Sequence, residues 1–307
     1  MKFYSRTEHE FETTPPKRTL SEKRNKGIIV LDKPSGPTSH QTVSYLKRII
    51  ECDKAGHGGT LDPKVTGVLP VALGRATKIA YAILGSDKVY VALAYFHDSL
   101  TSANLDELLS SFTGTIDQLP PVKSAVKRQW RKRKVHQIDV LDVKGQHVLM
   151  KIRCEGGTYI RKLIHDMGDH LDMGAHMQEL RRIQAGPFTE QSTVSLQEVQ
   201  DYYDFYREEL SNKILNMIRP MEEGVSHLPK IIAHNSTKKS LSHGAQLKIP
   251  GVVACTDVRF KDKVAVLSQD YELILIGEAR KAKEALLSEE RGIAVKTRQV
   301  YMRPEEV

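Results

Sequence analysis

Two hydrophobic periods alternate between Gly27 and Ile218. Alternating or β-branched apolar runs predict strands at Gly27–Leu31, Lys88–Phe96, Val135–Val143 and Val148–Ile152, with Gly145-Gln146 as a hairpin turn between the last two. Apolar residues at helical spacing predict helices at Gln41–Glu51, Leu105–Phe112 and Tyr159–Asp172, the first capped by Ser39. This alternation predicts an α/β (α+β) domain, a mixed sheet with helices packed on it, at residues 27–225.

The pattern changes beyond a boundary that we place at Pro220–Pro229. Short strands are predicted at Val252–Val258, Val264–Ser268, Leu273–Gly277 and Ile293–Met302, with a turn at Gln269-Asp270. They indicate a small all-β barrel at residues 229–304. Residues 1–26 form an arm rich in charged and hydroxyl groups, which would not fold alone. We expect this arm to be disordered or docked on the barrel.

Composition favours an anionic partner and an intracellular setting. The chain of 307 residues has a formal net charge of +8 and a pI near 9.2, and its basic residues cluster as in nucleic-acid-binding proteins. No apolar run approaches the roughly 20 residues of a membrane span, and the arm lacks the apolar segment of a secretory signal. Cys52, Cys154 and Cys255 have neither metal-ligand nor disulfide-framework spacing. We therefore expect a cytoplasmic protein with no membrane contact and no metal.

The most informative chemistry lies in the loop Gly56–Pro70. Pro63 biases Asp62 toward extended backbone angles, and the two glycines before it lack the Cβ that would keep another backbone at a distance. The loop therefore presents one carboxylate in a fixed, approachable position. Taken in isolation, such a motif is more often a surface turn whose Asp caps a helix.

This loop resembles the catalytic loop of the pseudouridine synthases of the TruB and dyskerin type, which isomerise uridine within RNA. The resemblance continues in family order through Gly27–His40, Lys88–Tyr90, Gly157–Arg161 and Gly174–Arg182. It extends from Gly27 to Pro304, and Leu241–Val252 looks like the opening of a PUA domain, an RNA-binding module. The barrel is therefore expected to be a PUA domain, and the mixed-sheet domain to be catalytic.

The resemblance implies roles for three residues. Asp62 would be the catalytic aspartate, as nucleophile or as base, and Arg161 would pair with it and keep it ionised. Tyr90 would stack on the flipped uracil and is a candidate for proton transfer. The structural alternatives are a helix-terminal Arg161 bonded to any nearby carboxylate and an inward-facing core Tyr90. The isomerisation has no net redox change and no group donor, so we expect no cofactor.

Two further residues match the substrate pocket of the family. His57 would lie near the extruded nucleotide, although a lone loop histidine is more often hydrogen-bonded to backbone. Leu180 would form an apolar wall of the uracil pocket, although a leucine in a helix, where we place it, is usually core.

A dense basic run at Lys127–Lys134 is the strongest candidate for holding RNA while the base is extruded. Its Trp130, the chain's only Trp, could stack on a base or cap the core. The preceding segment, Pro120–Arg128, is similar to the family's segment beside the active site. The expected RNA contacts are Lys127, Arg128, Arg131, Lys132, Arg133, Arg181, Arg182, Gly244, Ala245 and Gln246.

The resemblance is closest to the archaeal catalytic subunit of box H/ACA ribonucleoproteins. The interval from Tyr90 to Gly157 leaves little room for the insertion with which bacterial standalone enzymes grip tRNA, and the linker Met221–Lys230 looks like the archaeal form. This implies an H/ACA guide RNA, substrate rRNA, and small H/ACA ribonucleoprotein proteins as partners, with tRNA as a further substrate that needs no guide. The alternatives are a standalone tRNA pseudouridine synthase and a noncatalytic RNA-binding scaffold.

Overall fold

The computed structural model describes residues 2–120 and 127–306, which form two compact units. Unit 1 contains residues up to 28, residues 72–79 and residues from 218 onward. Unit 2 contains residues 29–71 and 80–217. The mixed α/β fold class expected from the sequence is confirmed.

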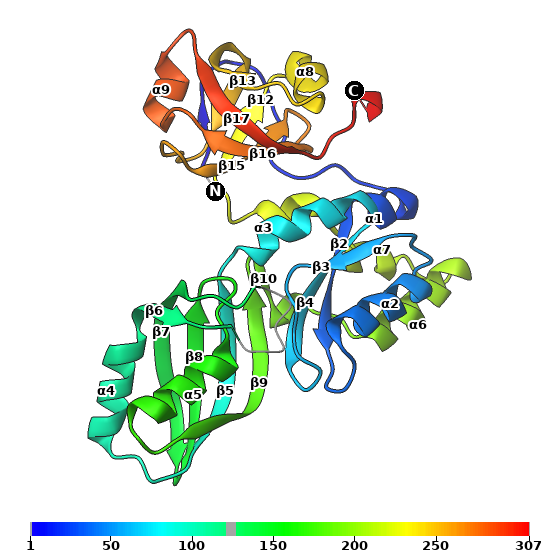
Figure 1. The fold of residues 1–307 in the computed structure, drawn as a ribbon. Coiled ribbons are helices and arrows are strands. Elements are labelled where there is room, and N and C mark those ends of the chain that lie inside the picture. The colour runs from blue at the N-terminus through cyan, green and yellow to red at the C-terminus, as the bar shows by residue number, and fades with distance from the viewer. Residues whose placement is uncertain (1, 121–126, 307) are drawn as a thin grey trace. The chain divides into compact units, whose positions relative to one another are not determined.

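Unit 2 is built on a long mixed sheet (Figure 1). Its strand order is β2-β4-β9-β5-β8-β7-β6, while β3 pairs with β4 and β10 pairs with β9. The strands are β2 (Gly27–Lys33), β3 (Ala55–His57), β4 (Thr66–Leu73), β5 (Lys88–Phe96), β6 (Gly114–Gln118), β7 (Arg131–Lys144), β8 (His147–Cys154), β9 (Ala175–Ala185) and β10 (Phe188–Thr189). The helices are α2 (Ser39–Ile49), α3 (Ala80–Leu84), α4 (Ser102–Phe112), α5 (Ile160–His170), α6 (Leu196–Arg207) and α7 (Lys213–Met217).

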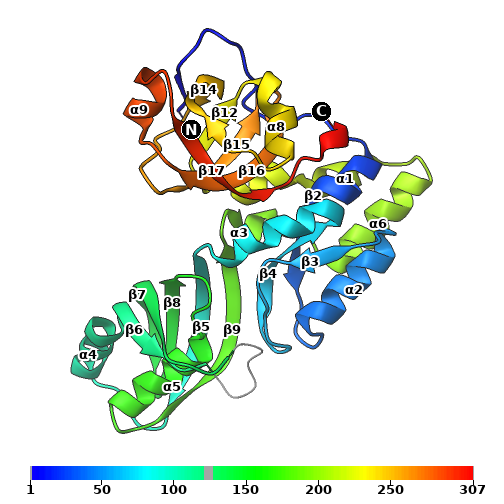
Figure 2. The same ribbon diagram turned by 45° about the horizontal axis from the view of Figure 1, so that its top comes forward.

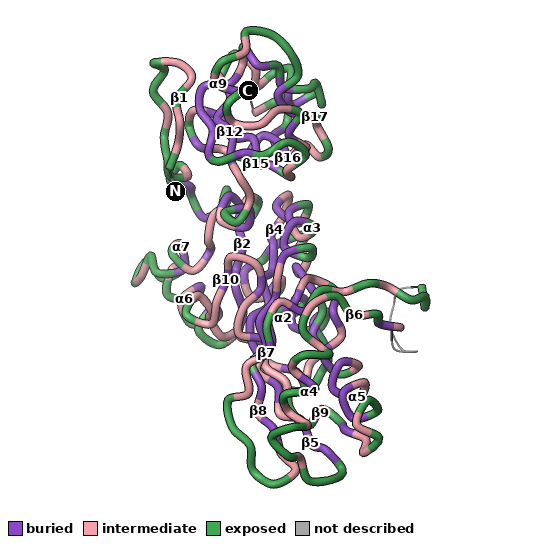
Figure 3. The backbone as a smooth tube through the Cα atoms, turned by 90° about the vertical axis from the view of Figure 1, so that its left-hand side faces the viewer, coloured by how far each residue is buried: buried purple, intermediate pink, exposed green. Residues whose placement is uncertain are grey.

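Helices α4 and α5 pack against one half of this sheet, as two views show (Figures 1 and 2). The alternate residues Tyr90, Ala92, Ala94 and Phe96 of β5 point into one hydrophobic cluster with residues of α4, α5, β7 and β8. The alternation of apolar residues along this strand in the sequence predicts that these side chains share its buried face. In Figure 3 the strands carry most of the buried backbone.

Strand β9 corrects the helix expected around Leu180. Residues 175–185 pair antiparallel with β5 over its whole length, and Thr66 and Gly67 of β4 pair with them in parallel on the other side. Gly67 has φ +103°, and a Cβ there would collide with the backbone of Arg182, so β4 approaches β9 this closely only because residue 67 is glycine. The pairing of two neighbouring strands overrides the weak local preference of this segment.

The N-terminus of α2 also differs from the expectation. Thr38 is the N-cap and forms a capping box with Gln41. Ser39 lies one position inside the helix, buried, where its hydroxyl donates to the carbonyl of Leu61 and accepts from the Leu61 N–H, both at 2.9 Å. Ser39 therefore fastens the Asp62 loop, a role that its sequence position does not reveal.

The sheet of unit 1 has the order β1-β14-β12-β15-β16-β17-β13. Its strands are β1 (Tyr4–Ser5), β12 (Lys230–Ala233), β13 (Leu247–Lys248), β14 (Val252–Cys255), β15 (Lys263–Ser268), β16 (Leu273–Ala279) and β17 (Ile293–Val300). The short β11 (Arg219–Pro220) pairs with the first two residues of β2. Helices α8 (Lys238–Ser242) and α9 (Lys283–Ser288) interrupt the section that the sequence indicated as all-β.

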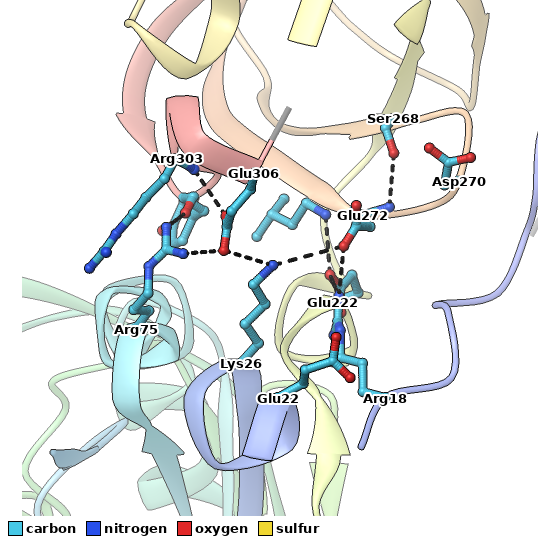
Figure 4. Close-up of polar contacts among 12 residues, drawn as sticks. Arg18, Glu22, Lys26, Arg75, Glu222, Ser268, Asp270, Glu272, Arg303 and Glu306 are labelled. Atoms are coloured by element: carbon cyan, nitrogen blue, oxygen red, sulfur yellow. Dashed lines mark hydrogen bonds and ion pairs between the residues drawn. The ribbon is translucent and has the colours of Figure 1, made fainter. Parts of the chain in front are cut away.

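The N-terminal arm is ordered within unit 1. Tyr4 and Ser5 pair antiparallel with Cys255 and Ala254, and α1 (Leu20–Lys26) starts with a capping box between Thr19 and Glu22. A polar network links this arm to four other segments of unit 1, those of Arg75, Glu222, Glu272 and Glu306 (Figure 4). At its centre, the buried side chain of Arg18 donates two hydrogen bonds to the buried Glu222 carboxylate, at 2.8 and 2.9 Å.

Candidate active site

The centre of the candidate site is an ion pair in unit 2. Arg161 Nη2 lies 2.6 Å from Asp62 Oδ2, and the side chains are 59% and 51% exposed, respectively. The structure thus brings together two residues that lie about a hundred positions apart in the sequence, as the resemblance implied. Because both remain half-exposed, the carboxylate is open to a substrate, and a bound base would exclude water and strengthen the pair's electrostatic interaction.

Backbone hydrogen bonds hold the Asp62 loop on both sides of the carboxylate. The Val65 N–H donates to the Asp62 carbonyl at 3.0 Å, and the Gly36 N–H donates to the Pro63 carbonyl at 2.9 Å. The fully buried Lys33 points its ammonium at three carbonyls, those of Pro34 (2.8 Å), Pro63 (3.0 Å) and Val65 (3.0 Å). Lys33 and Ser39 thus fix the loop from its buried side. Sequence reasoning identified neither role: it proposed Ser39 as a helix cap, and nothing in the turn at residues 33–36 marks its lysine as buried.

Replacing Lys33 by methionine removes these bonds and should let the Asp62 carboxylate shift. We expect the isomerisation of uridine that the resemblance implies to slow by roughly 10²-fold, because a misplacement of about 1 Å near reacting groups has that effect. The measurement is the single-turnover rate of product formation, below the melting temperature of the variant. Lys64→Met, which changes an exposed lysine of the same loop, is the control and should keep the normal rate. A normal rate in Lys33→Met would show that the other hydrogen bonds of the loop are enough to hold Asp62 in place.

Arg161 is placed by the start of α5. Its helix begins at Ile160 with Tyr159 as an N-cap that makes no side-chain cap bond. The buried amide of Gln118 fixes that cap: Oε1 accepts from the Tyr159 N–H at 3.0 Å, and Nε2 donates to the Tyr159 carbonyl at 3.2 Å. Gln118 is a third positioning residue, after Lys33 and Ser39, whose role the sequence did not reveal.

Tyr90 is 8% exposed and belongs to a hydrophobic cluster next to this pair. The cluster contains Leu61 and Ile160, the chain neighbours of Asp62 and Arg161, and Leu180 packs against it, partly buried. Leu180 stands opposite Ala92 on the neighbouring strand. Tyr90, the proposed apolar wall and the chain neighbours of the ion pair therefore share one apolar cluster.

Arg182 does not lie where the sequence analysis expected it. It is 1% exposed, so it offers no surface to RNA in this structure. Its Nε donates to the Val68 carbonyl at 2.8 Å and its Nη2 to the Gly59 carbonyl at 3.1 Å. Consecutive side chains of a strand point to opposite faces, and Arg181 accordingly pairs elsewhere, with Asp32 at 2.9 Å and with Glu190 at 2.5 Å.

His57 borders the loop at the end of β3. Its ring lies 5.1 Å from that of His40, centroid to centroid, and its Nδ1 is buried without a hydrogen-bond partner among the described residues. Burial, with smaller contributions from His40 and Arg182, lowers the pKa of His57. The imidazole is therefore neutral at neutral pH, with one ring nitrogen unused.

Four family profiles match consecutive parts of the chain. They are the DKCLD (NUC011) domain at residues 1–43, the N-terminal domain of TruB family pseudouridylate synthases at 47–160, the C-terminal domain of tRNA pseudouridylate synthase B at 161–226 and the PUA domain at 229–301. A Methanopyrus kandleri protein named probable tRNA pseudouridine synthase B is 44% identical over 300 residues, which are 97% of this chain and 89% of that protein. The chain belongs to the TruB family of pseudouridine synthases.

Other relatives of this TruB-family chain agree. A Pyrococcus furiosus protein of the same name is 44% identical over 291 residues, covering 94% of this chain and 86% of its own. The crystal structure of a Cbf5-Nop10-Gar1 complex contains a chain with TM-score 0.90 and 41% identity, covering 99% of this chain and 95% of that one. The structure of an H/ACA RNP bound to a substrate RNA containing 2'-deoxyuridine matches with TM-score 0.87 and 39% identity, covering 99% and 95%. The resemblance stated from the sequence is confirmed.

The basic run of the TruB-family chain leads into β7. Lys127, Arg128 and Lys132 are exposed, and Trp130 is 67% exposed, so Trp130 does not cap the core. Arg131 and Arg133 are half-buried, and Arg133 Nε donates to the Gly157 carbonyl at 3.1 Å. Residues 121–126 of the segment compared with the family lie outside the described residues.

In unit 1, the predicted RNA contacts Gly244, Ala245 and Gln246 form an exposed turn between α8 and β13. Gly244 has φ +90°, which suits glycine, and the Thr297 hydroxyl donates to the Ala245 carbonyl at 2.6 Å. The turn is therefore a fixed surface feature of the PUA domain.

One set of described side chains has the spacing to share a metal ion, and it is not part of this site. His165, Asp166 and Asp169 lie on α5, where Asp166 is already paired with Lys162. No helix in the described part of the chain combines the length and apolar character of a membrane span.

Proposed function

We propose that this pseudouridine synthase acts as the catalytic subunit of an H/ACA ribonucleoprotein, isomerising uridines of rRNA that a guide RNA selects. The chemistry rests on one observation, the Asp62–Arg161 ion pair beside Tyr90 and an apolar wall. Guide dependence is supported by the likeness over 99% of the chain to a structure of a Cbf5-Nop10-Gar1 complex. We place the reaction in the cytoplasm.

In this proposal each residue of the site in unit 2 has a separate role. Net, the C1′–N1 bond of uridine is replaced by a C1′–C5 bond, and one proton moves from C5 to N1, so the substrate supplies every atom. Asp62 acts on the sugar or the base as nucleophile or base, and Arg161 pairs with its carboxylate. Tyr90 and Leu180 hold the detached uracil between flat apolar surfaces, and His57 borders the entry of the nucleotide.

The remaining predicted residues would hold RNA. Cations neutralise phosphates and give salt-dependent affinity. We assign this role to the exposed Lys127, Arg128 and Lys132 and to the half-buried Arg131, Arg133 and Arg181. The turn at Gly244–Gln246 of the PUA domain (residues 229–304) would contact the guide. Small H/ACA ribonucleoprotein proteins would complete the particle, as the Nop10 and Gar1 of the similar structure accompany Cbf5.

A second candidate function has its own support. The curated relatives carry the name probable tRNA pseudouridine synthase B, which favours a reaction on tRNA without a guide. Both functions use the same site, so they differ only in how RNA is delivered.

Tritium release from 5-tritiated uridine separates these functions. The protein is incubated with a tRNA or an rRNA fragment, with and without an H/ACA guide and its partner proteins. We expect release from rRNA only with the guide, and none with a guide whose pairing segments are scrambled. Release from tRNA by the protein alone would make it a standalone synthase, and no release under any condition would leave a noncatalytic scaffold.

A further inference from the structure

Arg182 is a buried cation whose described partners include no carboxylate. Its guanidinium donates hydrogen bonds to the backbone carbonyls of Val68 and Gly59, and burial lowers its pKa. Burying an ion without a counterion is costly, and an apolar residue of similar volume often serves stability as well or better. Stability alone therefore does not explain an arginine at this position.

The third neighbour of the Arg182 guanidinium is Tyr90. The two residues stand opposite each other on the antiparallel strands β5 and β9, so their side chains leave the sheet on the same face, and each shifts the pKa of the other. The Asp62 loop lies against the same group: Gly59 has φ +135°, and a Cβ there would lie 3.4 Å from Arg182 Nη1. One planar side chain is thus bonded to β4 and to the Asp62 loop and stands opposite Tyr90.

We propose that Arg182 is a positioning residue that fixes the phenol of Tyr90 relative to the Asp62 loop, so that the phenol oxygen reaches the atoms of the uracil that exchange a proton. The proposal rests on the proposed pseudouridine synthase function. A guanidinium suits the task because its rigid fork can donate in several directions at once, whereas an ammonium is a point charge on a flexible stem.

The charge of Arg182 also acts on the phenol. Burial raises the pKa of Tyr90, and Arg182 opposes that shift. Two other ionisable groups face the phenol. Cys154 of β8 stays a thiol because burial raises its pKa to about 12, and Lys88, on the strand of Tyr90, has its pKa lowered to about 8, mainly by burial. Removing Arg182 should therefore move the titration of Tyr90 to higher pH.

A double-mutant cycle tests whether Arg182 acts through Tyr90. The single-turnover rate of pseudouridine formation is measured for Arg182→Met, Tyr90→Phe and the double variant. We expect Arg182→Met to lose about 10²-fold, the typical effect of removing one oriented donor, and to lose far less when Phe already replaces Tyr90. Arg182→Lys should recover part of the rate, and the same cycle with Lys serves if Arg182→Met does not fold.

The pH profile gives a readout that a purely structural role would not move. The limb of the rate profile that disappears in Tyr90→Phe should lie at higher pH in Arg182→Met than in the wild type, and closer to its wild-type position in Arg182→Lys, which keeps the positive charge. Lys230→Met is the matched control, since Lys230 is also a buried cation, and its hydrogen bonds within the described residues go to the backbone carbonyls of Val225, Ser226 and Leu228. It should lower the melting temperature and leave the profile unchanged.

Independent, multiplicative losses in the cycle together with an unmoved profile would overturn the proposal and leave Arg182 as a structural residue. That result differs from a failure of the proposed function, in which the wild-type protein itself releases no tritium from any RNA.

Discussion

Replacing Asp62 by asparagine is expected to abolish pseudouridine formation, by roughly 10⁴-fold or more, as for other residues that take part directly in a chemical step. An amide of the same shape cannot serve as the nucleophile or the base, and it offers Arg161 no charge. RNA affinity should survive, because the loop is held by bonds that do not involve this carboxylate, such as those from Lys33 to the Pro63 and Val65 carbonyls. Tritium release and a filter-binding titration with the same RNA measure the two properties side by side.

The control for this variant is Asp87→Asn. Asp87 is likewise half-exposed, and its Oδ2 lies 3.0 Å from Arg153 Nη2, so the substitution removes a similar ion pair from the same unit. Surface pairs of this kind contribute little to stability, and we expect both rate and affinity to stay near normal. Full activity of Asp62→Asn would reject the mechanism, whereas loss of RNA binding together with activity would show that the carboxylate also holds the loop.

Among the elements that the sequence predicted, the most accurate are those that carry Tyr90 and Arg161, two of the proposed catalytic residues. Strand β5 has the predicted bounds, Lys88–Phe96, and α5 lies within the predicted Tyr159–Asp172. Both carry a strong apolar period, so a local pattern matches the face that they bury. Asp62 and Arg161 were brought together by the resemblance, since no local rule relates residues so far apart in the chain.

The failures share a physical cause. Residues 175–185 have little strand character of their own and become β9 because β4 and β5 pair on either side of them. In a strand, the side chains of Arg181 and Arg182 point to opposite faces. The expectation that both would contact RNA is therefore wrong for Arg182, which is buried. Lys33, Ser39 and Gln118 were missed for a related reason: each bonds backbone groups of a distant segment, and sequence shows a side chain's chemistry without its burial.

Glu222→Gln is the second substitution with a large expected effect, and it acts on stability. In unit 1 the Glu222 side chain is fully buried and accepts two hydrogen bonds from Arg18, and it also accepts one from the Leu273 N–H at 3.2 Å. Removing one partner of a buried ion pair leaves the other charge uncompensated and typically costs about 3–5 kcal/mol. Calorimetry, or chemical denaturation followed by circular dichroism, measures this loss of stability. Tryptophan fluorescence does not suit unit 1, because the single tryptophan, Trp130, lies in unit 2.

Two variants identify the uncompensated charge as the cause. Glu272→Gln removes a carboxylate that lies 3.7 Å from the same Arg18 and is only partly buried (Figure 4), so it should cost less than about 1 kcal/mol. Arg18→Met combined with Glu222→Gln removes both charges while the glutamine oxygen still accepts from the Leu273 N–H, and it should regain most of the lost stability. If the double variant is as unstable as Glu222→Gln alone, the loss comes from packing or from the backbone bond, and the charge of Arg18 is compensated by its other neighbours in the network.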